Sequence, residues 1–196
     1  MVNSIDGYDE WENICGAGKI LPAFPGAGGS IKDDVLDAAL TPKIIQPTTF
    51  AEISGTRTDR IRCLSLIFKK SSIPYQIVKD MHIWQLCHIA MVVPIADAYY
   101  EADNPAKTGY EYKIMHKTAK ALKRNFQFVR KNCGKLSPWK MNIFLFVPIP
   151  ILTIIMLFVF RSAFGKKFMY QHSIKAPDEM RELHKQFYEY MQNVTN

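Results

Sequence analysis

Apolar residues recur with a helical period along most of the chain after residue 55. The segment 108–134 shows the pattern most clearly, because its basic residues also return every three or four positions and Gly134 is a natural stop. Its predicted apolar face comprises Tyr110, Ile114, Ala121, Leu122, Phe126 and Val129. Its basic stripe comprises Lys113, Lys117, Lys120, Arg124 and Lys131. This stripe is typical of a solvated helix face, and the sharper alternative is an electrostatic guide for an anionic ligand.

Three further helices are predicted in the same part of the chain. The segment 55–72 has apolar positions at helical spacing and lysines in its last turn. The segment 80–103 is apolar nearly all round, which predicts a buried helix kinked at Pro94. The segment 176–192 begins with Pro177 and Asp178, which suit a first helical turn.

The first 54 residues have a different pattern. A short helix over 7–16 is followed by strand candidates over 19–24 and 43–53, and the glycine loop FPGAGG (24–29) lies between them. So few strands cannot bury both faces of a sheet without more chain or a partner. The sequence therefore predicts a domain over 1–54 that is a remnant of an α/β fold, and a helical domain over 55–196.

The run 142–160 is almost entirely apolar and raises the question of a membrane. Pro148 and Pro150 interrupt it, and the uninterrupted part would rise only about 15 Å, roughly half of a hydrocarbon core. A buried helix, or an apolar face covered by a second subunit, is therefore preferred to a membrane span.

Composition limits the class of protein. The 196 residues carry a net charge of +7, and the globular balance of 48% hydrophobic and 22% charged residues excludes a disordered chain. The excess of basic residues permits an anionic partner, but no nucleic-acid recognition motif is present. The four scattered cysteines predict reduced, mostly buried thiols, and the polar, acidic start is unlike a signal peptide. We therefore expect a cytoplasmic protein.

Common catalytic templates are missing. The chain has no G-x-x-x-x-G-K-[ST], no H-E-x-x-H and no G-x-G-x-x-G between a strand and a helix. His82 and His88 are six residues apart on one predicted helix and so lie on different faces, which argues against a shared metal. The residues alone therefore predict an α/β fragment followed by a helical domain.

The order of motifs resembles the ketopantoate reductase (2-dehydropantoate 2-reductase) family. VNSIDGYDEW resembles the asparagine–glycine segment late in the family's nucleotide-binding domain, and ILPAFPGAGG resembles the following strand and glycine loop. The entry into the family's helical domain is similar to IQPTTFAEISGTRTDRIRCLSLIFKKSSIP. The long central helix of that domain is similar to WQLCHIAMVVPIADAYY, and its late helix is similar to HSIKAPDEMREL. The likeness extends over nearly the whole chain.

This resemblance implies a mainly α fold. Residues 55–196 would be a multi-helical domain of the 6-phosphogluconate dehydrogenase C-terminal-like type, preceded by a short α/β remnant of a Rossmann-type domain. It implies NADP as the cofactor, a small 2-oxo acid as the substrate, a homodimer, and a role in pantothenate biosynthesis. A lysine in the family helps to polarise or protonate the substrate oxygen.

The resemblance also assigns site residues. Asn3 matches the family's asparagine near the nicotinamide and substrate, although a turn asparagine is an equal interpretation. Asp178 and Glu179 lie near its late acidic position, and helix N-terminal charge is the alternative interpretation. The loop glycines Gly26, Gly28 and Gly29 would allow positive φ and close backbone approach at the edge of the cofactor site.

Two departures limit the expected activity. The family's dinucleotide fingerprint would lie upstream of Met1, so we expect this chain to be the C-terminal portion of such a protein. The expected lysine is replaced by Leu86, or by Gln85 if the register shifts by one, and neither carries a charge. The primary hypothesis is therefore a reductase portion that is not competent alone. The alternatives are a non-catalytic helical dimerisation or regulatory module, and a membrane-associated protein that uses 142–160.

Overall fold

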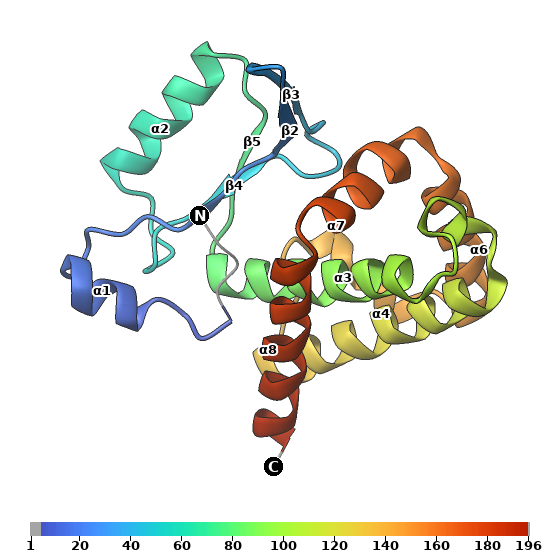
Figure 1. Cartoon of the computed structure of the whole chain (residues 1–196). Coiled ribbons are helices and arrows are strands. Elements are labelled where there is room, and N and C mark those ends of the chain that lie inside the picture. The colour runs from blue at the N-terminus through green and yellow to red at the C-terminus, as the bar shows by residue number, and fades with distance from the viewer. Residues whose placement is uncertain (1–4, 196) are drawn as a thin grey trace. The chain divides into compact units, whose positions relative to one another are not determined.

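The computed structural model describes residues 5–195, apart from the side chains of residues 30, 32, 37, 172 and 195. The protein is mainly helical with a small sheet, which confirms the coarse fold class (Figure 1). It divides into two compact units, Met1–Gln85 and Leu86–Asn196. The predicted boundary after residue 54 lies inside the first unit and stays a prediction.

The first unit contains a three-stranded sheet in the order β1-β4-β5. Its elements are the helix α1 (Asp9–Cys15), strands β1 (Ala23–Phe24) and β4 (Thr48–Phe50), helix α2 (Asp59–Lys70) and strand β5 (Tyr75–Ile77). Strand β1 pairs antiparallel with β4, whereas β4 and β5 are parallel and joined through α2. A parallel pair needs a long crossover, and α2 supplies it. The side chain of Thr58 caps α2 by accepting from the Ile61 N–H.

The core of the first unit is aromatic. Phe50 is fully buried and its ring packs against Phe68 and Tyr75, at centroid distances of 5.6 and 6.0 Å. A second cluster joins Ala51, Met81 and Trp84 to the half-buried Tyr8, Phe24 and Val78.

The predicted glycine loop is wrong in detail, because its second half is a strand. Strands β2 (Ala27–Lys32) and β3 (Val35–Leu40) form a hairpin in which Gly28 pairs with Ala39 and Gly29 with Ala38. The turn residues Asp33 and Asp34 both have positive φ, at 50° and 61°, which is the backbone of a type I′ turn. This two-residue turn fixes the register of the hairpin.

Close backbone approach is present at Gly26. A Cβ on Gly26 would lie 2.3 Å from the Thr48 backbone nitrogen, so only glycine fits against β4 there. Positive φ is not the reason for these residues, since Gly26, Gly28 and Gly29 are not among the described glycines with positive φ.

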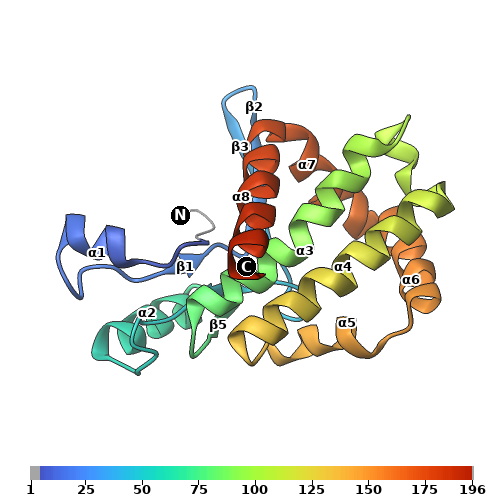
Figure 2. The same ribbon diagram turned by 90° about the horizontal axis from the view of Figure 1, so that it is seen from below.

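The second unit is built from helices. It comprises most of α3 (Met81–Glu101), the 3₁₀ turn η1 (Pro105–Tyr110), α4 (Tyr112–Cys133), η2 (Trp139–Asn142), α5 (Ile143–Phe146), α6 (Ile149–Arg161), the π-helical segment η3 (Gly165–Tyr170), α7 (Gln171–Lys175) and α8 (Pro177–Thr195). Helices α3 and α4 lie side by side, and α8 runs across them (Figures 1 and 2). Asn125 of α4 donates its amide to the Ala90 carbonyl of α3, at 3.3 Å.

Most of the helix predictions are confirmed. Helix α3 is buried through its centre and continues through Pro94, and α4 ends at Gly134, whose φ of 69° is a left-handed cap. Tyr110 is a correction: it lies in η1, ahead of α4, and its side chain is 64% exposed instead of belonging to the buried face. The Arg161 guanidinium lies over its ring at 4.3 Å.

The apolar run 142–160 forms α5 and α6, separated at Val147 and Pro148. In the described part of the chain, no single helix is both long enough and apolar enough to cross a membrane. The helices Ile149–Arg161 and Gly165–Lys175, which are bent relative to each other, reach that length and apolar character only when they are taken together.

Candidate functional site

The residues assigned by resemblance do not form one described site. Asn3 lies outside the described residues. Gly26, Gly28 and Gly29 belong to the first unit, where the Gly26 N–H donates to the Thr48 hydroxyl at 3.0 Å and the other two lie in β2. Gly28 and Gly29 lie in an antiparallel ladder and not in a turn that leads from a strand into a helix, which is the geometry in which successive N–H groups converge on a phosphate.

Asp178 and Glu179 lie in the first turn of α8, and both are exposed. Asp178 accepts a hydrogen bond from Arg181 at 2.9 Å, an exposed i,i+3 pair. This geometry supports the interpretation of favourable helix N-terminal charge.

The two positions at which the family would carry its lysine are both buried. Leu86 has no exposed area, and the Gln85 side chain accepts a hydrogen bond of 2.5 Å from the Tyr8 hydroxyl. Burial, with a smaller contribution from the Asp80 charge, raises the pKa of the Tyr8 phenol, which therefore stays a donor. Neither Leu86 nor Gln85 presents an ionisable group.

The histidines and cysteines are dispersed. The His82 Nε2 donates to the Ile5 carbonyl at 2.7 Å, and His88 is buried on the same helix. Among the described residues, no group of three or more His, Cys, Asp or Glu could hold a metal. The cysteines are free, but Cys15 and Cys63 are exposed, which corrects the expectation of mostly buried thiols. Cys15 lies at the end of the short helix α1, and Cys63 lies on the solvent-facing side of the amphipathic helix α2.

An open groove of about 980 Å³ lies in the second unit, between α3, α4 and α8 and next to the start of α6. Four basic side chains and two carboxylates line it together with a histidine and two tyrosines. The lining residues are Pro94, Asp97, Ala98, Tyr100, Glu101, Lys117, Thr118, Lys120, Ala121, Lys123, Arg124, Gln127, Ile149, His184 and Tyr188. We call this space the α4 groove.

The basic side of the α4 groove comes from one face of α4. Lys117 forms an ion pair with Glu101 at 2.6 Å, and Lys123 donates to the Val147 carbonyl at 3.1 Å. Lys120 is exposed and has no hydrogen-bond or ion-pair partner among the described residues. One ammonium group of the groove is therefore available to a ligand.

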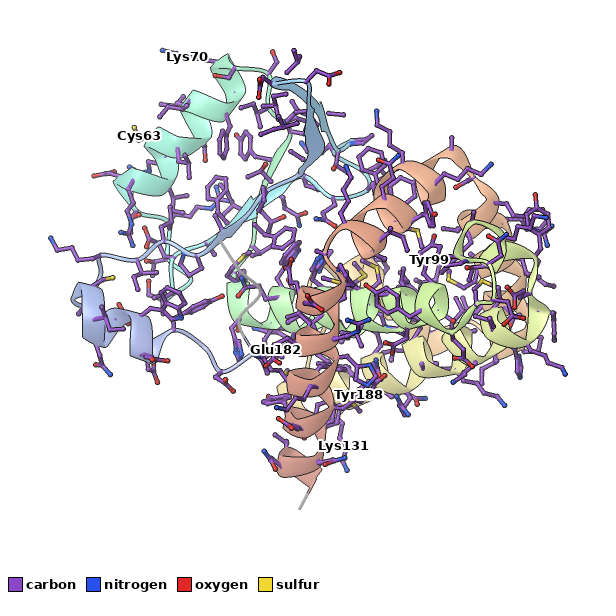
Figure 3. All side chains as sticks on the ribbon, in the orientation of Figure 1. Cys63, Lys70, Tyr99, Lys131, Glu182 and Tyr188 are labelled. Atoms are coloured by element: carbon purple, nitrogen blue, oxygen red, sulfur yellow. The ribbon has the colours of Figure 1, made fainter. Side chains whose placement is uncertain are left out.

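Arg124 is held in place by α8. Its guanidinium lies over the Tyr188 ring at 5.1 Å and donates to the Tyr188 hydroxyl at 2.9 Å. Figure 3 shows Tyr188 on the side of α8 that faces α4. Such a fixed, planar donor suits a carboxylate or phosphate, because the remaining N–H groups stay directed and ordered.

The opposite side of the groove carries a histidine–carboxylate pair. His184 Nδ1 of α8 lies 2.9 and 3.0 Å from the two carboxylate oxygens of Asp97 on α3. Burial raises the pKa of Asp97, and the charge of His184 partly opposes that rise. Since Nδ1 faces the carboxylate, Nε2 is the ring nitrogen that a ligand would meet.

These contacts give the α4 groove a net positive lining. The two carboxylates are engaged by Lys117 and His184, which leaves the charges of Lys120, Lys123 and Arg124 without a carboxylate partner in the groove. The groove can therefore bind a small anion and place a polarisable group of that anion near His184.

Sequence reasoning found part of this site. Lys117, Lys120 and Arg124 of the predicted basic stripe line the groove, while Lys113 and Lys131 do not. Asp97 and His184 were missed because they are 87 residues apart and meet only when α8 crosses α3. No local spacing pattern predicts such a pair.

Comparison with family models, with curated proteins and with solved structures gives no match to this chain. The resemblance to the ketopantoate reductases therefore stays a prediction from the order of motifs.

Proposed function

We propose that this chain is the C-terminal portion of a ketopantoate reductase-like, NADP-dependent oxidoreductase, and that its helical unit binds a small 2-oxo acid in the α4 groove. The helices would constitute the 6-phosphogluconate dehydrogenase C-terminal-like domain, and the small sheet the end of the cofactor domain. The order of a small α/β unit followed by a helical unit supports this proposal.

The observation that carries the choice of ligand is the uncompensated charge of Lys120 and Arg124 in the groove. A 2-oxo acid offers a carboxylate to this pair and a ketone oxygen to a hydrogen-bond donor such as His184. The side chains of Lys120 and Arg124 lie one helical turn apart on α4, which suits two-point recognition of one carboxylate.

The proposal separates binding from catalysis. Leu86 is not among the residues that line the groove, and it cannot hold or move a proton. Loss of one electrostatic catalyst costs about 10²–10³ in rate. We therefore propose that this chain binds the acid but does not reduce it.

Titration of the labelled chain with 2-oxoisovalerate, followed by amide NMR shifts, tests the binding. The perturbed amides should cluster on α3, α4 and α8 around the groove. The double variant K120Q/R124Q should raise the dissociation constant at least about tenfold, since hydrogen bonds to charged groups contribute about 1.5–3 kcal/mol each.

The variant K113Q/K131Q is the matched control, because it removes the same charge from the same helix outside the groove. Equal loss of affinity in both variants would mean that 2-oxoisovalerate responds only to the general charge of α4, and would overturn the assigned site. Absence of any shift in the unmodified chain would overturn the proposed ligand.

A further inference from the structure

Helix α6 is apolar on two opposite sides. Leu152, Thr153, Met156 and Phe160 are buried, and the helix packs on α4 (Figure 2). The exposed large apolar side chains are Ile151, Ile154, Ile155 and Phe158, which follow the i, i+3, i+4, i+7 spacing of a single helical stripe. The stripe that faces away from the core is therefore as apolar as the stripe that builds it.

The exposed stripe has neighbours of the same kind in the preceding elements. Phe146 and Ile143 of α5 are 80% and 55% exposed, and Trp139 of η2 is 83% exposed. Helix α5 also packs on α4. We call this set the outer face: Trp139, Ile143, Phe146, Ile151, Ile154, Ile155 and Phe158. Monomeric proteins seldom expose so many large apolar side chains from consecutive elements, so a partner is expected.

The stretch of sequence that carries the outer face has charges of one sign. From residue 112 to residue 177 the sequence contains no Asp or Glu, but it contains 13 Lys and Arg. Lys140 is exposed directly after Trp139, and Lys166 and Lys167 are exposed shortly after α6 ends. In the sequence, the apolar residues of the outer face are thus flanked on both sides by exposed cations.

We propose that the outer face docks the protein on an anionic lipid surface. Helix α6 has 13 residues, a length of about 20 Å, so it is too short to cross a hydrocarbon core of about 30 Å. Its exposed isoleucines and Phe158 would insert into the boundary between headgroups and acyl chains, where Trp139 is also favoured. Lys140, Lys166 and Lys167 would contact the anionic headgroups.

A second copy of the chain fits this surface less well. A twofold contact places the same patch of each subunit against the other, so the cations at both ends of the outer face would approach their equivalents. The acid-free stretch 112–177 offers no carboxylate to compensate them. Like charges brought together at an interface cost affinity, whereas an anionic membrane neutralises them.

Flotation of the full chain with lipid vesicles tests this proposal. We expect it to float with phosphatidylcholine vesicles that contain about 30 mol% phosphatidylglycerol, to float much less with pure phosphatidylcholine, and to dissociate at high salt. The variant I151S/F158S changes two exposed side chains and should lower the partition coefficient at least about tenfold. The variant L66S/I67S changes two exposed apolar side chains of α2 and is the matched control.

A second pair of variants tests how much the lysines contribute to binding of anionic vesicles. K166E/K167E should lower binding to anionic vesicles at least about tenfold, because each basic residue near the surface contributes about 1 kcal/mol. K69E/K70E makes the same change in net charge on α2 and should have a smaller effect. Thermal unfolding of each variant confirms that the fold is retained.

Three results would overturn the proposal. The first is equal binding to neutral and anionic vesicles, and the second is no binding to either. The third is a dimer in light scattering that I151S/F158S dissociates while vesicles recover no protein, which would assign the outer face to a second copy.

Discussion

At the residue scale, the best-defined polar interaction in the first unit is the ion pair between Glu52 and Arg60. The Glu52 carboxylate is buried and accepts hydrogen bonds from Arg60 Nε, at 2.7 Å, and from the Thr58 hydroxyl. Arg60 also donates to the carbonyls of Gly18 and Ile20, each at 2.8 Å. One guanidinium therefore joins the segment before β1 to the segment between β4 and α2.

This pair predicts a loss of stability in acid. The hydrogen bond from Arg60 is the main cause that holds the pKa of Glu52 below its ordinary value. The hydrogen bond from the Thr58 hydroxyl and the charge of Arg60 lower this pKa further, whereas burial of the carboxylate raises it. The folded state therefore binds the proton more weakly than the unfolded state. The stabilisation is complete above the ordinary carboxyl pKa and is lost as the pH falls from about 5 through the lowered pKa.

The variant E52Q should lower the free energy of unfolding by about 2 kcal/mol at neutral pH, since it leaves Arg60 without its carboxylate. The difference from the unmodified chain should shrink as the pH falls. Urea denaturation at neutral and acidic pH measures both effects, and E10Q on exposed α1 is the control. A difference that is independent of pH would contradict the role of the ion pair.

At the scale of single elements, the helices were more predictable than the strands. The predicted segments 55–72, 80–103 and 176–192 correspond to α2, α3 and α8, because apolar positions every three or four residues leave few alternatives. The hairpin β2–β3 was missed, since its strands are rich in Gly, Ala and Asp and its Asp-Asp turn is not the usual Asn-Gly. The α4 groove needed long-range packing that no local pattern encodes.

The hairpin turn gives a prediction at this scale. Asp33 and Asp34 both hold the left-handed backbone, a conformation that Asn-Gly adopts at lower cost. The variant D33N/D34G should raise amide hydrogen-exchange protection in β2 and β3 about fivefold, which corresponds to roughly 1 kcal/mol. D34P should abolish that protection, because proline cannot reach positive φ. Unchanged exchange in both variants would show that the turn does not limit the stability of the hairpin.

At the scale of the whole molecule, each unit has its own surface chemistry. The second unit combines a net positive groove with an apolar outer face, and both lie within or next to the acid-free stretch 112–177. All 18 Asp and Glu residues of the chain lie outside that stretch, and in the first unit Glu52 uses its carboxylate to stabilise the fold. Both proposals for the helical unit, the binding of an acid and the docking on a lipid surface, therefore depend on this excess of positive charge.

NADP is the cofactor that the family resemblance implies. Pyrophosphate binding in a Rossmann-type domain needs a glycine-rich turn that leads from a strand directly into a helix, so that backbone N–H groups and the helix dipole meet the phosphates. In the described sheet, β4 reaches α2 only through residues 51–58, and the glycines of FPGAGG continue into the hairpin. This chain alone should therefore bind NADPH weakly, with no saturation of cofactor fluorescence in the micromolar range. A micromolar or tighter constant would contradict this expectation, and a variant K120Q/R124Q that lost such binding would place the nucleotide phosphates in the α4 groove instead.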